Sequence, residues 1–170
     1  ISPSGDENLA VFSSIIHLGS NPALIGFILR PKTVPRNSHA NMKSTGVFTL
    51  NAISSNQIED AHHTSAKYPD NISEFDQTNL EPEIKQGWKA PYVKGAQIQI
   101  GCTYVNEYLI KENDTVLVVG KIEHLFIEEQ LLGKDGWIQL DKGDIVSING
   151  LDGYAIPTLI KRFEYARPKK

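Results

Sequence analysis

Two arginines and a predicted helix start lie close together near residue 36, and these residues are the best suited to bind a ligand. Arg30 and Arg36 stand at the two ends of a short loop, and Asn37 and Ser38 come directly before a helical segment predicted over residues 39–45. The side-chain oxygen of Ser38 can accept a hydrogen bond from a first-turn amide, as helix-capping residues do. A helix N-terminus carries unpaired amides and a partial positive charge, to which Arg36 adds a full charge. The arrangement therefore predicts an anion site suited to a phosphate group.

The segments around this loop predict a strand–loop–helix–strand unit. Apolar residues 24–29 precede the loop and residues 47–53 follow the helix, while Gly46 stands where a left-handed helix stop is expected. The loop over residues 30–36 contains two prolines, which fix φ and remove backbone donors, so regular structure is excluded there. A plain structural unit with surface arginines has the same pattern, and the residues alone leave both interpretations open.

Composition limits the class of protein and its partners. A chain of 170 residues with 40% hydrophobic and 22% charged residues fits one globular domain over residues 1–170. The net charge of −3, with no long basic run before residues 167–170, argues against nucleic acid as the main partner. No apolar stretch approaches the ~20 residues of a membrane span. The single cysteine, Cys102, excludes an internal disulfide and favours a reducing, cytoplasmic setting.

The first residues have the pattern of a hairpin turn. Residues 2–8 are rich in Ser, Pro, Gly, Asp and Asn, and they lead directly into the apolar stretch 9–18. We therefore expect Ile1 to be the end of an earlier N-terminal strand that is missing from this sequence.

The rest of the chain predicts a mainly β structure with short helices. Residues 97–104 alternate strictly, which places Ile98, Ile100, Cys102 and Tyr104 on one face of a strand. Helical segments are expected over residues 57–67 and 72–80, and residues 81–94 are expected to form a packed surface excursion. The expected strands cover residues 9–18, 24–29, 47–53, 97–104, 115–127 and 144–148. This order of elements is typical of a β-barrel with helical insertions.

Other chemical sites find little support in the sequence. Neither a dinucleotide-binding G-x-G-x-x-G after a strand nor a phosphate-binding G-x-x-x-x-G-K-[ST] loop is present. His62 and His63 are adjacent, so on a helix they point about 100° apart, and the metal-binding pattern H-E-x-x-H is missing. Ser13, Ser14 and Ser65 show no sign of a base held against them, as a nucleophile requires. We predict no metal site and no catalytic nucleophile.

Several stretches share the pattern of one protein family, in order and over nearly the whole chain. They are NLAVFSS at 8–14, SNPALIGF at 20–27, RP at 30–31, PRNS at 35–38, NMKSTGVFTLN at 41–51, AHHTSAKY at 61–68, EFD at 74–76, APY at 90–92 and DGY at 152–154. Together they resemble the flavin reductase-like, FMN-binding split-barrel family, which includes flavoredoxin. The chain departs from the family pattern at Gly101, where a Glu often precedes the cysteine, and over residues 71–94.

The resemblance implies a fold and an assembly. The family fold is a six-stranded Greek-key split β-barrel, usually a homodimer that binds one FMN per subunit near the interface. Its members include NAD(P)H-dependent flavin reductases, ferric reductases and electron carriers. By resemblance, the redox chemistry is carried out by FMN, and the protein contributes no catalytic residue.

The resemblance also implies which residues hold the cofactor. Those expected along the edge of the flavin ring are Phe12, Ser13 and Ser14. Those expected at the phosphate are Arg30, Thr33, Arg36, Asn37 and Ser38, in agreement with the anion site inferred above. Those expected near the ring or the ribityl chain are Asn51, His63, Thr64 and Ser65.

Three functions fit these observations. The first is an FMN-dependent oxidoreductase that uses NAD(P)H to reduce flavin or another small acceptor. The second is a flavin-binding electron carrier without nicotinamide activity. The third is a non-enzymatic β-barrel binding module whose arginines hold a different anion. Flavin uptake separates the third from the other two, and reduction by a nicotinamide separates the first from the second.

Overall fold

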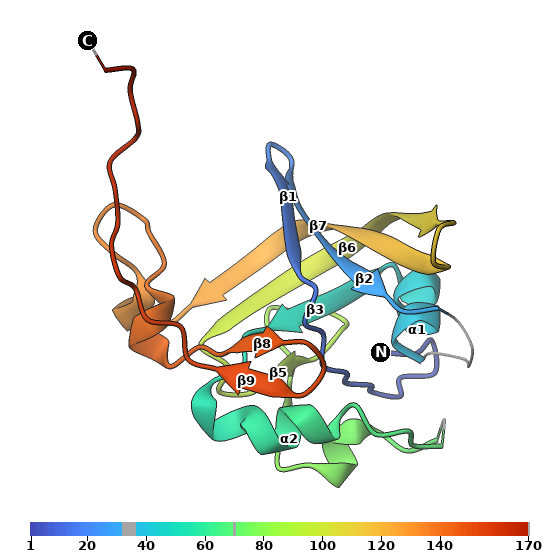
Figure 1. Cartoon of the computed structure of the whole chain (residues 1–170). Coiled ribbons are helices and arrows are strands. Elements are labelled where there is room, and N and C mark those ends of the chain that lie inside the picture. Colours follow the sequence, from blue (N-terminus) through green and yellow to red (C-terminus); the bar gives the residue numbers. More distant parts are fainter. Residues whose placement is uncertain (32–36, 70, 170) are drawn as a thin grey trace.

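The computed structural model describes residues 1–31, 37–69 and 71–169, and its centre is one antiparallel sheet (Figure 1). The strand order is β1-β2-β7-β6-β3, so strands that are distant in sequence become neighbours. Their bounds are Ile16–Ser20 for β1, Ala23–Leu29 for β2, Val47–Asn51 for β3, Ile98–Ile110 for β6 and Thr115–Ile127 for β7. Helix α1 (Asn37–Thr45) packs at one end of this sheet, and helix α2 (Ile58–His63) lies below it.

Short elements complete the structure. The 3-10 helices are η1 (Ser55–Gln57), η2 (Glu74–Gln77), η3 (Glu129–Leu131) and η4 (Leu140–Gly143). Two small hairpins pair β4 (Pro82–Glu83) with β5 (Tyr92–Val93), and β8 (Ser147–Asn149) with β9 (Gly153–Ala155). The expected packed excursion over residues 81–94 is therefore confirmed, since Tyr92 is fully buried.

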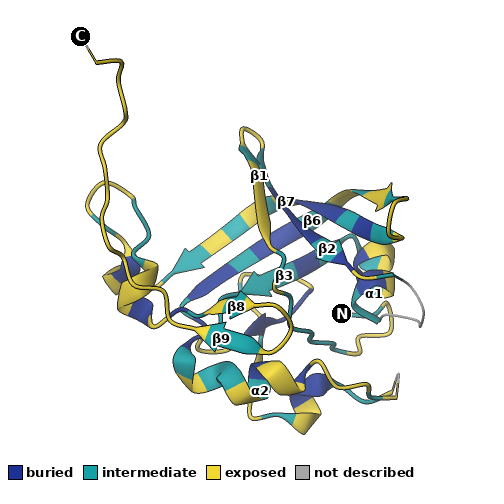
Figure 2. Ribbon diagram, in the orientation of Figure 1, coloured by how far each residue is buried: buried dark blue, intermediate teal, exposed yellow. Residues whose placement is uncertain are grey.

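The two long strands β6 and β7 carry the core. The alternation predicted for residues 97–104 is confirmed only in part: Cys102 is completely buried and Ile100 and Tyr104 pack on the same cluster, but Gln99, expected on the polar face, is buried as well. Phe27, Phe48 and Val118 complete its centre, and Figure 2 shows the dark, buried bands crossing the middle of the sheet. The pairing of β6 with β7 has two register shifts, between Gly101 and Cys102 and between Tyr104 and Asn106, and shifts of this kind increase the local twist.

The first predicted strand is mostly wrong. A strand was expected over residues 9–18, but β1 begins only at Ile16. The residues before it leave the sheet because the amide of Leu9 donates a 2.9 Å hydrogen bond to Glu74 instead of pairing with a strand. The helix expected over residues 57–67 is also shorter, because α2 ends at His63.

Helix α1 begins two residues earlier than expected. It starts at Asn37, so Ser38 lies inside the first turn and is not the capping residue. The hydroxyl of Ser38 donates to Asn8 Oδ1 at 2.6 Å. The predicted stop at Gly46 is confirmed: its φ is +74° and its amide donates to the carbonyl of Met42.

The expected architecture, mainly β with short helices, is confirmed. The principal sheet has five strands in the described part of the chain, where six were expected. Within the described ranges, we find no helix that combines the length and the apolar character needed to span a bilayer.

Candidate functional site

An open cleft of about 1100 Å³, part of it open to solvent, lies beside β3 and α1. The extended residues 8–12 form one wall, β3 and the residues just after it form the second, and α1, α2 and the segments around residues 75–93 close the rest. Most lining side chains are apolar, namely Leu9, Val11, Phe12, Ile15, Phe27, Met42, Val47, Phe48, Leu50, Ile53, Ala61, Phe75, Leu80 and Val93.

Three aromatic rings meet at the base of the cleft. Phe12 packs edge-on against Phe27 with ring centroids 4.9 Å apart, and Phe27 packs against Phe48 at 5.7 Å. No charged side chain lines the cleft among the residues that the structure describes. An apolar floor with aromatic walls favours a flat, largely uncharged ring system over a charged substrate.

A buried carboxylate holds the wall formed by residues 8–12. Glu74, in η2, is 9% exposed and accepts hydrogen bonds from Asn8 Nδ2 at 2.8 Å and from the Leu9 amide at 2.9 Å. Asn8 Oδ1 in turn accepts the hydroxyl proton of Ser38. The side chains of Glu74, Asn8 and Ser38 thus connect η2, the N-terminal wall and the first turn of α1 around one end of the cleft.

The polar side chains of β3 hold the opposite wall. Asn51 Oδ1 accepts from the amide of Val93 at 3.0 Å, and its Nδ2 lies 3.2 Å from Thr49 Oγ1. The Thr49 hydroxyl donates to the carbonyl of Pro91 at 2.6 Å. These bonds connect the sheet to the loop before β5, so the walls are fixed by hydrogen bonds as well as by packing.

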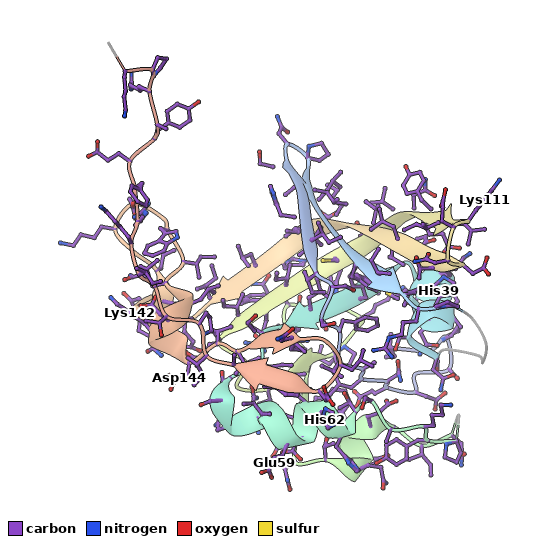
Figure 3. The ribbon with its side chains drawn as sticks, in the orientation of Figure 1. His39, Glu59, His62, Lys111, Lys142 and Asp144 are labelled. Atoms are coloured by element: carbon purple, nitrogen blue, oxygen red, sulfur yellow. The ribbon has the colours of Figure 1, made fainter. Side chains whose placement is uncertain are left out.

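An ionic cluster anchors α1 on its far side. Glu107 of β6 lies 2.5 Å from His39 Nε2 and 2.8 Å from Lys43 Nζ, and Figure 3 labels His39 on this helix. Burial raises the pKa of Glu107, but hydrogen bonds from His39, Lys43 and Tyr104 outweigh it and lower the pKa to about 2. Burial, and then Glu107 itself, raises the pKa of Tyr104 to about 12. The cluster fixes the helix that presents Ser38 to the cleft.

Two stretches that carried the family resemblance meet in space. His62 Nδ1 of α2 lies 3.1 Å from the Tyr154 hydroxyl of β9, and their rings pack edge-on. Figure 3 shows His62 on α2 below the β8–β9 hairpin. This contact fastens α2, whose Ala61 lines the cleft, to the last hairpin.

The structure places four of the expected cofactor residues along the cleft. Phe12, Ser38, Asn51 and Thr64 line it. Thr64 is buried, and its hydroxyl donates to the carbonyl of Ala61. The expected residues that are not in the lining are Ser13, Ser14, Arg30, Asn37, His63 and Ser65. Thr33 and Arg36 lie outside the described residues.

The roles visible for these other residues are mostly structural. The Ser14 hydroxyl bonds to the amide and carbonyl of Ile28, which continues the pairing of the β1–β2 hairpin. His63 Nε2 contacts the Tyr68 hydroxyl on the exposed side of α2. Arg30 is exposed directly after β2, and Asn37 opens α1.

Sequence reasoning missed the two residues that hold the cleft together, Asn8 and Glu74. Both belonged to stretches of the family pattern, but nothing in the residue types showed that they meet. Asn41 and Gln57 also line the cleft and were not predicted. Glu74 stands next to an apolar residue, Phe75, but its burial, and with it the need of the carboxylate for partners, is seen only in the structure.

Gly101 explains one departure from the family pattern. A Cβ at this position would lie 2.4 Å from the hydroxyl of Tyr92 and 3.3 Å from His124 Cβ. Tyr92 therefore occupies the space in which a Glu side chain would begin. The neighbouring Cys102 is completely buried, and burial followed by the charge of Glu123 raises its pKa to about 12, so this thiol is not a nucleophile.

No group of three or more potential metal ligands occurs within the described ranges. The cleft is therefore characterised by apolar contact, backbone groups and a few hydroxyl and amide side chains. These groups fit a flavin, since the rings can pack on the tricyclic system and the first turn of α1 offers amides to a phosphate.

Comparison with known proteins finds solved structures with a similar fold. A protein of Shewanella frigidimarina NCIMB 400 that has a split-barrel domain and is a proposed flavin reductase is 37% identical, with a TM-score of 0.93 over 97% of this chain and 82% of that chain. Flavoredoxin of Desulfovibrio vulgaris (Miyazaki F) is 19% identical, with a TM-score of 0.79 over 94% and 83% of the two chains. An FMN-binding protein from Thermus thermophilus is 18% identical, with a TM-score of 0.75 over 92% and 82%.

The last two similarities show the fold alone, and with the first they confirm the expected split-barrel fold. The model of the family described as "Flavin reductase like domain" matches residues 2–140, which is well over half of the chain. The chain therefore belongs to the flavin reductase-like family.

Proposed function

We propose that this protein is an FMN-dependent oxidoreductase that takes electrons from NAD(P)H and passes them to flavin or another small acceptor. The observation that carries the proposal is the cleft, which is lined by four phenylalanines and by no charged side chain among the described residues, and which ends at the first turn of α1. Family membership supports flavin as the cofactor. We treat residues 1–170 as one flavin-binding unit.

In this proposal, the apolar part of the cleft holds the ring system. Phe12, Phe27 and Phe48 provide the packing surface, and the backbone of residues 12–14 provides hydrogen bonds along the edge of the ring. Asn51 and Thr64 would approach the ring or the ribityl chain from the opposite wall, and His63 and Ser65, the sequence neighbours of Thr64, belong to the same proposed set. Bound FMN would accept a hydride from the nicotinamide and release electrons to the acceptor.

The phosphate end of the proposed site is at α1. The first-turn amides of the helix, among them that of Ser38, and the side chain of Asn37 offer donors, and Arg30 adds positive charge nearby in the sequence. Thr33 and Arg36 belong to the same proposed phosphate set. Ser38 is positioned by Asn8, whose side chain is in turn held by Glu74. Positioned donors bind a phosphate more strongly than mobile ones, since less ordering entropy is lost.

The protein is not required to transfer protons in this chemistry. The cleft lining contains no acid, base or thiol among the described residues, and the raised pKa of buried Cys102 keeps it protonated. The chain's contribution is to bind, orient and shield the cofactor. A cytoplasmic location is part of the same proposal, because reduced nicotinamides and a single-cysteine chain suit a reducing compartment. The proposal also includes a homodimer, as the family resemblance implies.

A binding experiment tests the assignment of the phosphate end. FMN and riboflavin are titrated into the wild type, Ser38→Ala and Ser44→Ala, and the affinities are read from flavin fluorescence. Ser44 is exposed on the same helix, away from the cleft lining, so it is the matched control. We expect Ser38→Ala to weaken FMN binding about tenfold, with riboflavin affected less, and Ser44→Ala to change neither. Equal FMN and riboflavin affinities in the wild type would contradict the assignment.

A further inference from the structure

Residues 156–169, named here the C-terminal arm, leave the rest of the protein as an extended segment without helix or strand (Figure 1). The arm is exposed along its whole length (Figure 2). Its large apolar side chains share this exposure: Ile160 is 96% exposed, Tyr165 90% and Phe163 75%. A contiguous group of exposed large apolar side chains marks an interaction surface.

Arg162 makes two contacts between the arm and the rest of its own chain. Arg162 lies 2.6 Å from Asp135 Oδ2 and stacks over the ring of Trp137 at 4.5 Å. Within the described residues, the arm forms no backbone–backbone hydrogen bond. Pro157 and Pro168 disfavour a helix, so the backbone remains extended. Arg162 thus directs the arm, while the apolar side chains and the solvent-exposed backbone groups of the arm are available to a partner.

The backbone of the arm favours a protein partner over a lipid bilayer. Unpaired amides and carbonyls are costly in hydrocarbon, whereas an extended segment satisfies them by adding to the edge of a sheet. The chain itself has such an edge, because β1 ends the strand order of the principal sheet in the described structure. Ile16 and Leu18 of this edge strand are both 41% exposed. The unpaired backbone groups of an edge strand can pair with an added strand from another chain.

Charge also favours a second copy of the chain as the partner. Residues 156–170 contain five Lys or Arg and one Glu, whereas the first 155 residues contain 12 basic and 19 acidic side chains. A basic arm is therefore attracted to the acidic remainder of another copy. This attraction raises the rate of encounter, and the apolar contacts provide the stability.

We propose that the C-terminal arm docks on a second copy of this chain, with its backbone along the edge of β1 and its apolar side chains against Ile16 and Leu18. In a two-fold dimer the contact forms twice. The two arms would bury on the order of 1,000 Å² of side-chain surface, which approaches the area of a stable interface. The inference deepens the proposed homodimer by naming the segment that holds it, and it does not depend on the flavin chemistry.

Light scattering of the full-length chain over a range of concentrations tests this proposal. The arm variant carries Ile160→Ser, Phe163→Ser and Tyr165→Ser together. All three side chains are exposed, so circular dichroism and the unfolding transition should remain those of the wild type. The acceptor variant is Leu18→Ser. The control variant is Tyr108→Ser, which removes an exposed aromatic side chain near the end of β6.

We expect the wild type to be a dimer. The dissociation constant of the dimer should increase about 100-fold in the arm variant. It should increase less in Leu18→Ser and remain unchanged in Tyr108→Ser. A monomeric wild type, or an arm variant that dimerises as the wild type does, overturns the proposal. Loss of the dimer in the arm variant but not in Leu18→Ser overturns β1 as the acceptor. Arm-dependent sedimentation of a monomer with phosphatidylglycerol–phosphatidylcholine vesicles overturns the choice of partner. Because the readout is mass, each outcome is independent of whether FMN binds.

Discussion

The carboxylate of Glu74 accepts hydrogen bonds from both the side chain of Asn8 and the amide of the next residue, across 65 residues of intervening sequence. This pairing draws residues 8–12 out of the sheet and makes them a wall of the cleft. Through Asn8, the same carboxylate also sets the position of the Ser38 hydroxyl. One buried acid therefore connects the fold to the proposed phosphate end of the site.

Replacing Glu74 tests this connection. Glu74→Ala removes two charge-assisted hydrogen bonds, so we expect the free energy of unfolding to fall by about 2–3 kcal/mol and FMN affinity to fall about tenfold. Denaturant unfolding and flavin titration measure the two effects. Asp76→Ala is the control, because Asp76 is exposed on the same 3-10 helix, and a change within about 0.5 kcal/mol is expected. Equal effects of the two substitutions would show that the hydrogen bonds of Glu74 to residues 8 and 9 do not stabilise the cleft.

The hydroxyl of Tyr92 leaves no room for a side chain at Gly101. A Cβ on Gly101 would lie 2.4 Å from Tyr92 Oη, so we expect Gly101→Ala to lower the free energy of unfolding by about 2 kcal/mol. Tyr92 Oη is buried and has no hydrogen-bond partner among the described residues, so Tyr92→Phe alone should change stability little. The double variant should recover at least half of the loss.

The control for this cycle is Gly19→Ala, where a Cβ meets only the carbonyl of Pro22 at 3.9 Å. Denaturant unfolding of the four proteins gives the coupling free energy directly. If Tyr92→Phe leaves the cost of Gly101→Ala unchanged, the strain has another source than the tyrosine hydroxyl.

The comparison of sequence with structure shows which features are local. The strand over residues 115–127 was predicted with the bounds that β7 has, and the stop at Gly46 was predicted correctly, because alternation and a positive φ are encoded by neighbouring residues. Residues 9–15 have the same apolar character but leave the sheet, since their partner Glu74 is distant in the sequence. The contact between the three rings at the base of the cleft could not be predicted from the sequence either, because Phe12, Phe27 and Phe48 meet only after the sheet has formed.

The ion cluster on α1 predicts a pH dependence of stability. The pKa of Glu107 is lowered to about 2 from an ordinary 4.5. A carboxyl whose pKa is lower in the folded than in the unfolded state stabilises the fold above its unfolded pKa, and this contribution is lost as the pH falls from about 4.5 to about 2. Because the cluster is partly exposed to solvent, we expect Glu107→Gln to cost only about 1–2 kcal/mol at neutral pH.

Unfolding free energies of the wild type and Glu107→Gln, measured from neutral pH down to about pH 2, check this dependence. The difference between the two proteins should shrink as the pH falls through that window. Glu112→Gln, in the exposed turn between β6 and β7, should follow the wild type throughout. A difference that stays constant with pH would mean that the charge of Glu107 is not what anchors α1.

Reduction of bound flavin tests the central claim most directly. The full-length protein is mixed with FMN, separated from unbound cofactor and titrated with NADH and then NADPH without oxygen, while the visible absorbance of the flavin is followed. We expect FMN to remain with the protein and at least one nicotinamide to bleach its absorbance stoichiometrically. Retained FMN that neither nicotinamide bleaches would contradict the oxidoreductase and favour an electron carrier, and a protein that retains no FMN would contradict flavin binding in the cleft.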